Sequence, residues 1–208
     1  RMRLKIFVFA TLFLVLSLTS YDLPTAYADE NFDISTDSTY QVTESGLTHV
    51  TQTVKIRNKT EYTYTPTYTI ITGITDLKNL KTYNGSGTLP NKIEETKDPL
   101  RPRDSEASGD KSIEISFPDK SVGFGRTNEF TISFDTNLIA RKKGSIWEVS
   151  IPGISDPSSF YEYNISLNVP STFPEPTITK PRRDFSTKGP YIFTKNEIGN
   201  SGILILFG

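Results

Sequence analysis

Regular alternation of apolar and polar residues runs through most of this chain, and it restricts the chain to one class of fold. Val50, Val54 and Ile56 share one parity of a run, while polar residues occupy the positions between them. Successive side chains of a strand point to opposite faces, so this period of two predicts half-buried strands. Further alternating runs lie within residues 40–42, 62–70, 76–83, 113–117, 130–134, 146–151, 161–169, 191–194 and 203–207.

The spacing of these runs predicts the architecture. No segment after residue 28 keeps a helical period, although residues 137–142 are long enough for one short helical turn. About ten strands joined by short turns predict an all-β fold, an antiparallel β-sandwich that is either saddle-like or immunoglobulin-like. We expect one domain over residues 29–208, with a candidate seam at 156–159 and a long polar loop within 91–110. Pro66 inside a strand-like run predicts an edge position or a bulge.

The first 28 residues have the pattern of a secretory signal peptide. A basic start, Arg1 to Lys5, precedes an uncharged apolar run from Ile6 to Leu18 and the small residues Ala26 and Ala28. We expect this signal helix to be cleaved after Ala28, which places the protein outside the cytosol without a membrane span. The alternative is a retained anchor, but the run is shorter than the roughly 18–20 residues of a spanning helix.

Composition narrows the chemistry that the chain can perform. It has no Cys, one His and a formal net charge of −1. Disulfides, thiolate metal sites, a Cys nucleophile and a multi-histidine metal site are therefore excluded, and no broad positive field attracts nucleic acid. His49 lies on the polar parity of its run, where we expect a solvent-facing strand residue. We expect no enzymatic activity, cofactor or metal, although a Ser or carboxylate site stays formally open.

Three tyrosines form a candidate ligand platform. Tyr62, Tyr64 and Tyr68 share one parity of the run around Pro66. Aromatic faces can stack on the apolar faces of sugars or peptides. The alternative is packing within or beside a sheet, since Tyr is a good strand residue.

The end of the chain predicts contact with a further domain. The run Ile203 to Phe207 is apolar on both parities, and such a strand requires cover on both faces. We expect the sequence to continue beyond Gly208. The candidate contact residues are the three on one parity of this strand together with the single tryptophan: Trp147, Ile203, Ile205 and Phe207.

Three stretches carry a resemblance to a known family. They are Tyr40–Thr51, Gly123–Phe134 and Gly144–Ile154. In these stretches the chain resembles the N-terminal β region of secreted bacterial transglutaminase-like proteins, especially those of candidate-phylum bacteria. The resemblance implies an extracellular β domain in front of a papain-like catalytic domain that uses Cys, His and Asp. Since this chain has no Cys, the resemblance reaches the accessory region only.

A looser likeness rests on the run Tyr163–Pro170 and on the apolar last strand. In these segments the chain is similar to the saddle-shaped N-terminal β domain of zinc aminopeptidases, although the His-Glu-x-x-His motif is absent. Both likenesses imply a non-catalytic domain whose partner is a downstream catalytic domain of the same polypeptide. The alternative is a free-standing secreted adhesive module that binds a cell-wall polymer or a peptide.

Overall fold

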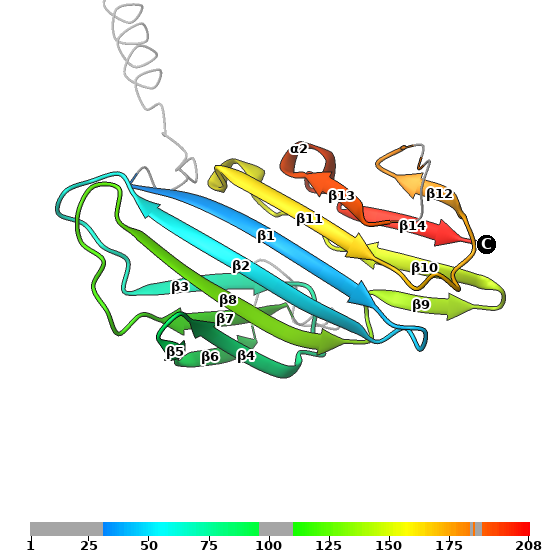
Figure 1. Ribbon diagram of the computed structural model, residues 1–208, viewed down its shortest axis with the longest axis horizontal. Helices are drawn as coiled ribbons and strands as arrows, with labels where there is room; N and C mark the ends of the chain where they lie inside the picture. Colours follow the sequence, from blue (N-terminus) through cyan, green and yellow to red (C-terminus); the bar gives the residue numbers. More distant parts are fainter. Residues whose placement is uncertain (1–30, 96–109, 184, 186–188) are drawn as a thin grey trace, which may run out of the picture.

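The computed structural model describes residues 31–95, 110–183, 185 and 189–208. It is a two-layer β-sandwich, which confirms the predicted all-β class. One layer is a large, long-stranded sheet, and the other consists of two smaller sheets (Figure 1). The predicted signal peptide, residues 1–28, lies outside the described residues.

The large sheet has seven strands in the order β13-β11-β1-β2-β8-β4-β5. Its centre is formed by β1 and β2, which contain 11 residues each. The bounds in chain order are β1 Phe32–Val42, β2 Thr48–Asn58, β4 Lys78–Asn84, β5 Gly87–Thr88, β8 Thr127–Thr136, β11 Glu162–Asn168 and β13 Tyr191–Thr194.

The second layer is divided into a four-stranded and a three-stranded sheet. The four-stranded sheet has the order β12 (Pro176–Lys180), β14 (Ile203–Phe207), β10 (Ile146–Ile151) and β9 (Ala140–Lys143). The three-stranded sheet has the order β3 (Thr67–Thr72), β7 (Lys111–Ser116) and β6 (Asn91–Glu95). Two short helices, η1 (Pro157–Ser159) and α2 (Lys195–Ile198), lie in connections.

The large sheet is mixed, which differs from the purely antiparallel sheets that we expected. Among the described strand pairs, β1 and β11 run parallel, with Thr36 opposite Tyr163 and Tyr40 opposite Leu167. The chain leaves the large sheet after β8, forms β9 and β10 in the other layer, and then returns. Parallel neighbours need such a crossover connection, whereas a tight hairpin would make them antiparallel.

The core lies between the layers. Val50, Val54 and Ile56 point inward and are buried, as the alternation predicts. Near the start of β8, the ring centroid of Phe130 lies 5.7 Å from that of Tyr68, which belongs to the three-stranded sheet. The four-stranded sheet covers β13, where ring centroids of Tyr191 and Phe207 are 6.0 Å apart. The large sheet therefore has two separate covers.

Several local expectations differ from the structure. Residues 137–142 contain a buried Ile139 and the first part of β9 in place of a helical turn. A single α-helical turn is found elsewhere, at α2. It begins with a reciprocal capping box between Thr194 and Glu197. A Thr followed three residues later by Glu is the sequence signal of this motif. The polar stretch 91–110 begins with strand β6, and its remaining residues 96–109 lie outside the described part.

The turn between β1 and β2 is fixed by a close approach to the opposite layer. Gly46 has φ +89°, and a Cβ atom there would lie 3.0 Å from Trp147 Cζ3 and 3.0 Å from the Ala140 carbonyl oxygen. Trp147 in turn stacks on Phe173, with centroids 4.5 Å apart and an interplanar angle of 16°. The hairpin tip is therefore held against the four-stranded sheet.

We predict that Gly46→Ala lowers the free energy of unfolding by roughly 1–3 kcal/mol, because the side chain is strained at positive φ and meets the indole. Equilibrium denaturation of the wild type and the variant measures the difference. Gly85→Ala is the control, since an added Cβ there meets nothing within 4 Å. Equal losses in both variants would contradict the role assigned to this contact.

Candidate functional site

A cavity lies where the two small sheets meet above the large sheet. One wall is β3 with the turn that follows it, and the other is the segment from Pro152 to Asp156 that follows β10. The floor belongs to β1, β2, β8 and β11 of the large sheet. The cavity has an inner chamber and an outer groove, which share six lining residues: Gln52, Ile70, Ile71, Gly73, Gly153 and Tyr163.

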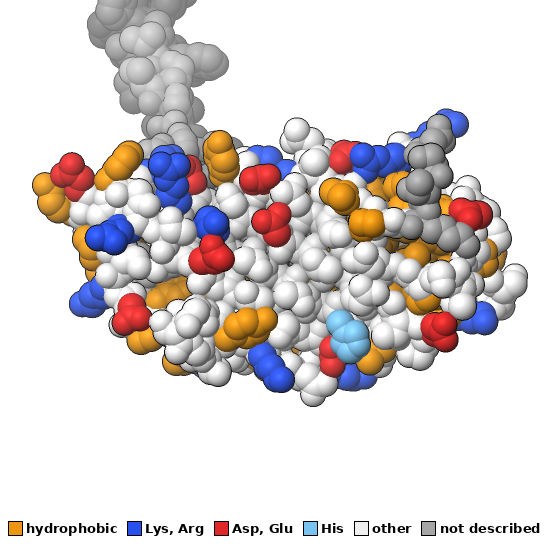
Figure 2. Space-filling view, in the orientation of Figure 1, with side chains coloured by type: hydrophobic (Ala, Val, Ile, Leu, Met, Phe, Trp, Pro, Cys, Tyr) orange, Lys and Arg blue, Asp and Glu red, His pale blue; other side chains and the backbone are white. Residues whose placement is uncertain are grey.

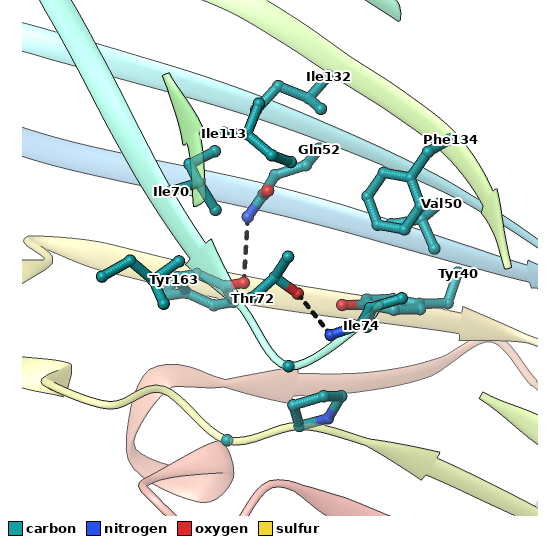
Figure 3. A pocket seen from close by; sticks show the side chains of 14 residues that line it. Tyr40, Val50, Gln52, Ile70, Thr72, Ile74, Ile113, Ile132, Phe134 and Tyr163 are labelled. Carbon is teal, nitrogen blue, oxygen red and sulfur yellow. Dashed lines mark hydrogen bonds between the residues drawn. The ribbon is translucent and has the colours of Figure 1, made fainter. Parts of the chain in front are cut away.

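The inner chamber has a volume of about 90 Å³, and its lining combines apolar side chains with polar groups (Figure 3). One of these polar groups is the amide of Gln52, whose Nε2 donates to the Tyr163 hydroxyl over 3.1 Å. Burial raises the pKa of Tyr163 and also that of Tyr40, so both phenols stay neutral at physiological pH. The chamber therefore presents neutral hydrogen-bonding groups beside apolar side chains.

Gln52 could have been identified from the sequence. It occupies the buried parity of β2, between Val50 and Val54, where an apolar residue is expected. Thr36 and Ser38 on β1 follow the same pattern, and both are buried, 1% and 3% exposed. Ser38 lies opposite Gln52, and Thr36 lies opposite Tyr163. Of these three polar residues, Gln52 lines the cavity, and Thr36 and Ser38 lie on the neighbouring strand beside it.

The outer groove is larger, with a volume of about 550 Å³, within the range of about 300–1,000 Å³ typical of ligand sites. Ile34, Phe160 and Tyr163 supply its apolar floor, and Asp110 and Asp156 lie in its lining. The described lining contains no Lys or Arg.

Asp156 is held by the turn that it begins. Its carboxylate accepts hydrogen bonds from the backbone amide of Ser158, at 3.0 Å, and from the hydroxyls of Ser158 and Ser159, both at 2.5 Å. These bonds, with those from the Ser158 and Ser159 side chains the largest, lower the pKa of Asp156. The groove therefore carries a negative charge there at neutral pH.

A second cluster lies on the outer face of the large sheet, which is largely covered by uncharged polar groups (Figure 2). Register places His49 of β2 directly opposite Asp135 of β8. His49 Nδ1 lies 2.5 Å from Asp135 Oδ1, and Asn79 Nδ2 donates to the other carboxylate oxygen over 2.7 Å. Hydrogen bonds from Asn79 and then from His49 lower the pKa of Asp135.

The pair of His49 and Asp135 resembles part of a catalytic triad, since a carboxylate orients an imidazole. Catalysis of this type also requires a nucleophile in hydrogen-bond reach of the other ring nitrogen. Among the described residues, the only side-chain partner of His49 is Asp135. The arrangement is that of a cross-strand pair that links β2 to β8 on an exposed face, with the His49 side chain 50% exposed.

We predict that Asp135→Asn lowers the stability at neutral pH by less than about 1 kcal/mol, because exposed pairs contribute little. A carboxylate whose pKa is lower in the folded state stabilises the fold above the unfolded-state pKa of about 3.9. The advantage of the wild type should therefore shrink as pH falls below about 4. Thermal unfolding of both proteins between neutral and acidic pH measures this, and a difference that does not depend on pH would count against it.

The four predicted contact residues lie inside the sandwich. Ile203, Ile205 and Phe207 are at most 1% exposed, and Trp147 is half-buried between Phe173 and the hairpin tip. The parity that Ile203, Ile205 and Phe207 share faces the large sheet, since the ring centroid of Phe207 lies 6.0 Å from that of Tyr191 on β13. Their contact with a further domain stays a prediction. The opposite parity of β14 carries Leu204 and Leu206, which are only partly buried.

The three tyrosines are separated by the structure. Strand β3 begins at Thr67, so Tyr62 and Tyr64 precede it, and they do not continue one strand face. Tyr68 packs against Phe130, and burial raises its pKa. Tyr62 is 87% exposed. A ligand platform stays a prediction, with Tyr62 as its accessible member.

Two kinds of feature are absent from the described part of the chain. None of its helices is long and apolar enough to cross a membrane. In the same residues, no cluster of three or more His, Asp or Glu side chains is arranged to hold a metal ion.

Comparison with known proteins gave no match to a family model and none to curated proteins. Among solved structures, the chain is similar to an M1 zinc metallopeptidase variant from Deinococcus radiodurans with a bound Tyr-Ser-Ala substrate. The sequence identity is 9% and the TM-score 0.45, over 86% of this chain and 42% of the other.

A two-domain M1 zinc metallopeptidase variant bound to L-tryptophan matches at 8% identity and a TM-score of 0.43, over 86% and 43% of the two chains. A further M1 zinc metallopeptidase structure from Deinococcus radiodurans matches at 9% and 0.41, over 85% and 38%. This chain spans less than half the length of each. None of these three structures is transglutaminase-like.

Proposed function

We propose that this chain is a non-catalytic β-sandwich domain, the N-terminal accessory region of a secreted protease-like or transglutaminase-like protein. It packs against a catalytic domain that follows it in the same polypeptide. The observation that supports this proposal is an apolar patch on the outer face of the four-stranded sheet. Its residues are Ile146 and Ile178, which are 42% and 52% exposed, and the partly buried Leu204 and Leu206.

The patch extends across neighbouring strands at Ile178 and Leu206. Ile178 of β12 lies directly opposite Leu206 of β14. A Cβ atom on Gly208 would lie 3.0 Å from Ile146 Cγ1, so residue 208 is next to the patch. The chain end lies at this end of the sandwich (Figure 1). Polypeptide that continues from residue 208 would therefore begin beside the patch.

Charged residues surround the patch in the way that is usual for interfaces between domains. Lys180 lies opposite Leu204, and Glu148 lies opposite Leu206. Lys143 Nζ donates to Glu148 Oε2 over 2.8 Å. An apolar centre with a polar rim is the common anatomy of protein interfaces. The contact stabilises both domains by removing apolar area from water, at about 25 cal/mol per Å².

The chemistry of the following domain is the finer part of this proposal. The first resemblance favours a papain-like domain with Cys, His and Asp, and the looser one favours a His-Glu-x-x-His zinc domain. The absence of Cys and the single His of this chain support a role without catalysis. The signal-like pattern of residues 1–28 supports secretion, with cleavage after Ala28.

The test uses the protein extended by whatever its gene encodes after the codon for Gly208. We predict that Ile178→Asp in that protein increases cleavage between the domains in limited proteolysis and lowers the unfolding temperature. Ile192→Asp is the matched control, since Ile192 is 54% exposed on β13 of the other layer. Equal effects of the two variants, or a stop codon after Gly208, would refute the docking role.

A second candidate function is a free-standing secreted module that adheres to cell-wall glycan. The observation that favours it is the exposed ring of Tyr62, with Tyr64 two residues further along the chain; the ring centroid of Tyr64 lies 5.4 Å from Lys120 Nζ. An aromatic face supplies an apolar stacking surface, and a neighbouring ammonium group attracts an acidic group of a ligand.

For this candidate, we expect Tyr62→Ala to reduce retention of the protein on purified cell-wall glycan by about tenfold. The reason is that the exposed ring would supply the stacking surface. Tyr161→Ala is the control, because Tyr161 is 71% exposed at a different place. Unchanged retention of the Tyr62 variant would exclude the platform.

A further inference from the structure

Strand β3 has a free edge. It is the outermost strand of the three-stranded sheet, and among the described strands it pairs only with β7. The phase of this pairing is fixed by a 2.8 Å hydrogen bond from the Phe117 amide to the Pro66 carbonyl. Backbone groups alternate in direction along a strand. Those of Tyr68, Ile70 and Thr72 therefore point toward β7.

The backbone groups of the intervening residues, Thr69 and Ile71, consequently point away from β7. Both residues line the outer groove, as does Gly73 after the end of the strand. The free edge therefore runs along the groove and directs amide and carbonyl groups toward it. Unsatisfied strand edges of this kind form a template for a further strand.

The opposite wall does not supply that strand. It consists of the segment from Gly153 to Asp156, which carries no strand assignment. The amide of Ile154 is bonded to the Gly199 carbonyl over 2.9 Å, on the side of α2. The groove is therefore bounded by a strand edge on one side and by a loop fastened to its own layer on the other.

The lining of the groove also indicates which types of side chain a bound strand would carry. A strand added to β3 would point alternate side chains toward the large sheet, where Ile34, Phe160 and Tyr163 form an apolar floor. The lining adds the carboxylates of Asp110 and Asp156 without a cationic side chain among its described residues. Charge complementarity therefore favours a peptide that carries basic residues.

We propose that the groove binds an extended peptide segment of a partner protein, which adds to β3 as an outer strand. The peptide has apolar residues at alternate positions and at least one Lys or Arg near the carboxylates. Main-chain hydrogen bonds would supply affinity, and the floor would supply specificity, as in other cases of strand addition. This site is separate from the patch around Ile178, so either proposal can fail alone.

A second copy of this chain is a less suitable occupant. Pairing of two β3 edges would bring together two strands with the sequence Thr-Tyr-Thr-Ile-Ile-Thr, which carry no charge. It would also bring the carboxylates of Asp110 and Asp156 from both copies into one groove. Like charges at such close range oppose association.

The experiment uses a synthetic peptide in which Val and Lys alternate over seven residues, with blocked ends and a fluorescent label. Binding to the whole chain is followed by fluorescence polarisation. The key variant is Thr69→Pro, which removes the amide that points into the groove and leaves the bonds to β7 intact. Ile93→Pro is the matched control, because Ile93 lies on β6, at the opposite edge of the same sheet.

We expect saturable binding by the wild type and by Ile93→Pro, and at least about tenfold weaker binding by Thr69→Pro. Asp110→Asn should weaken binding of this peptide more at low than at high salt. Replacing every Lys of the peptide by Glu should abolish binding. Circular dichroism and thermal unfolding confirm that the variants are folded.

Three results would overturn the proposal. The first is no saturable binding by the wild type up to about 1 mM peptide. The second is equal binding by Thr69→Pro and the wild type. The third is a wild-type dimer in analytical ultracentrifugation that Thr69→Pro dissociates, because the edge would then be occupied by a second copy.

Discussion

Burial of the inner face of the large sheet is the constraint on which the rest of this structure depends. β1 and β2 have 11 residues each and extend over roughly 37 Å. The strands that cover them are six residues long at most, about 20 Å. Two small sheets therefore cover the inner face together. One packs over Phe130, and the other packs against the β1–β2 hairpin and β13. A boundary between the two covers is the geometric consequence.

That boundary explains why polar residues are found in the middle of the core. Where the covers meet, apolar packing is interrupted, and Gln52 and Tyr163 satisfy each other in the gap. A buried amide or phenol without a hydrogen-bond partner would destabilise the fold, so the two groups must lie within hydrogen-bond distance of each other. The same interruption exposes the edge of β3, because no described strand of the four-stranded sheet reaches it. The groove thus follows from how the covers are divided.

The alternation of residues predicted more of the fold than of the site. It identified the buried parity of β2 and the class of fold, and it favoured an edge position for the strand after Pro66. It could not say which face of the last strand meets the core, since Ile203 to Phe207 are apolar on both parities. It also could not bring His49 to Asp135, because residues 86 positions apart meet only through strand register.

The sequence by itself determined that this chain forms strands, which side chains of most strands are buried, and that cysteine and multi-histidine chemistry are excluded. Those properties depend on residue type and on a local period, which the order of residues contains. The tertiary structure decided that the second layer is divided and that β11 runs parallel to β1. It also decided that the groove has an open strand edge. These features depend on which distant strands pair, and pairing is set by packing of the whole sandwich.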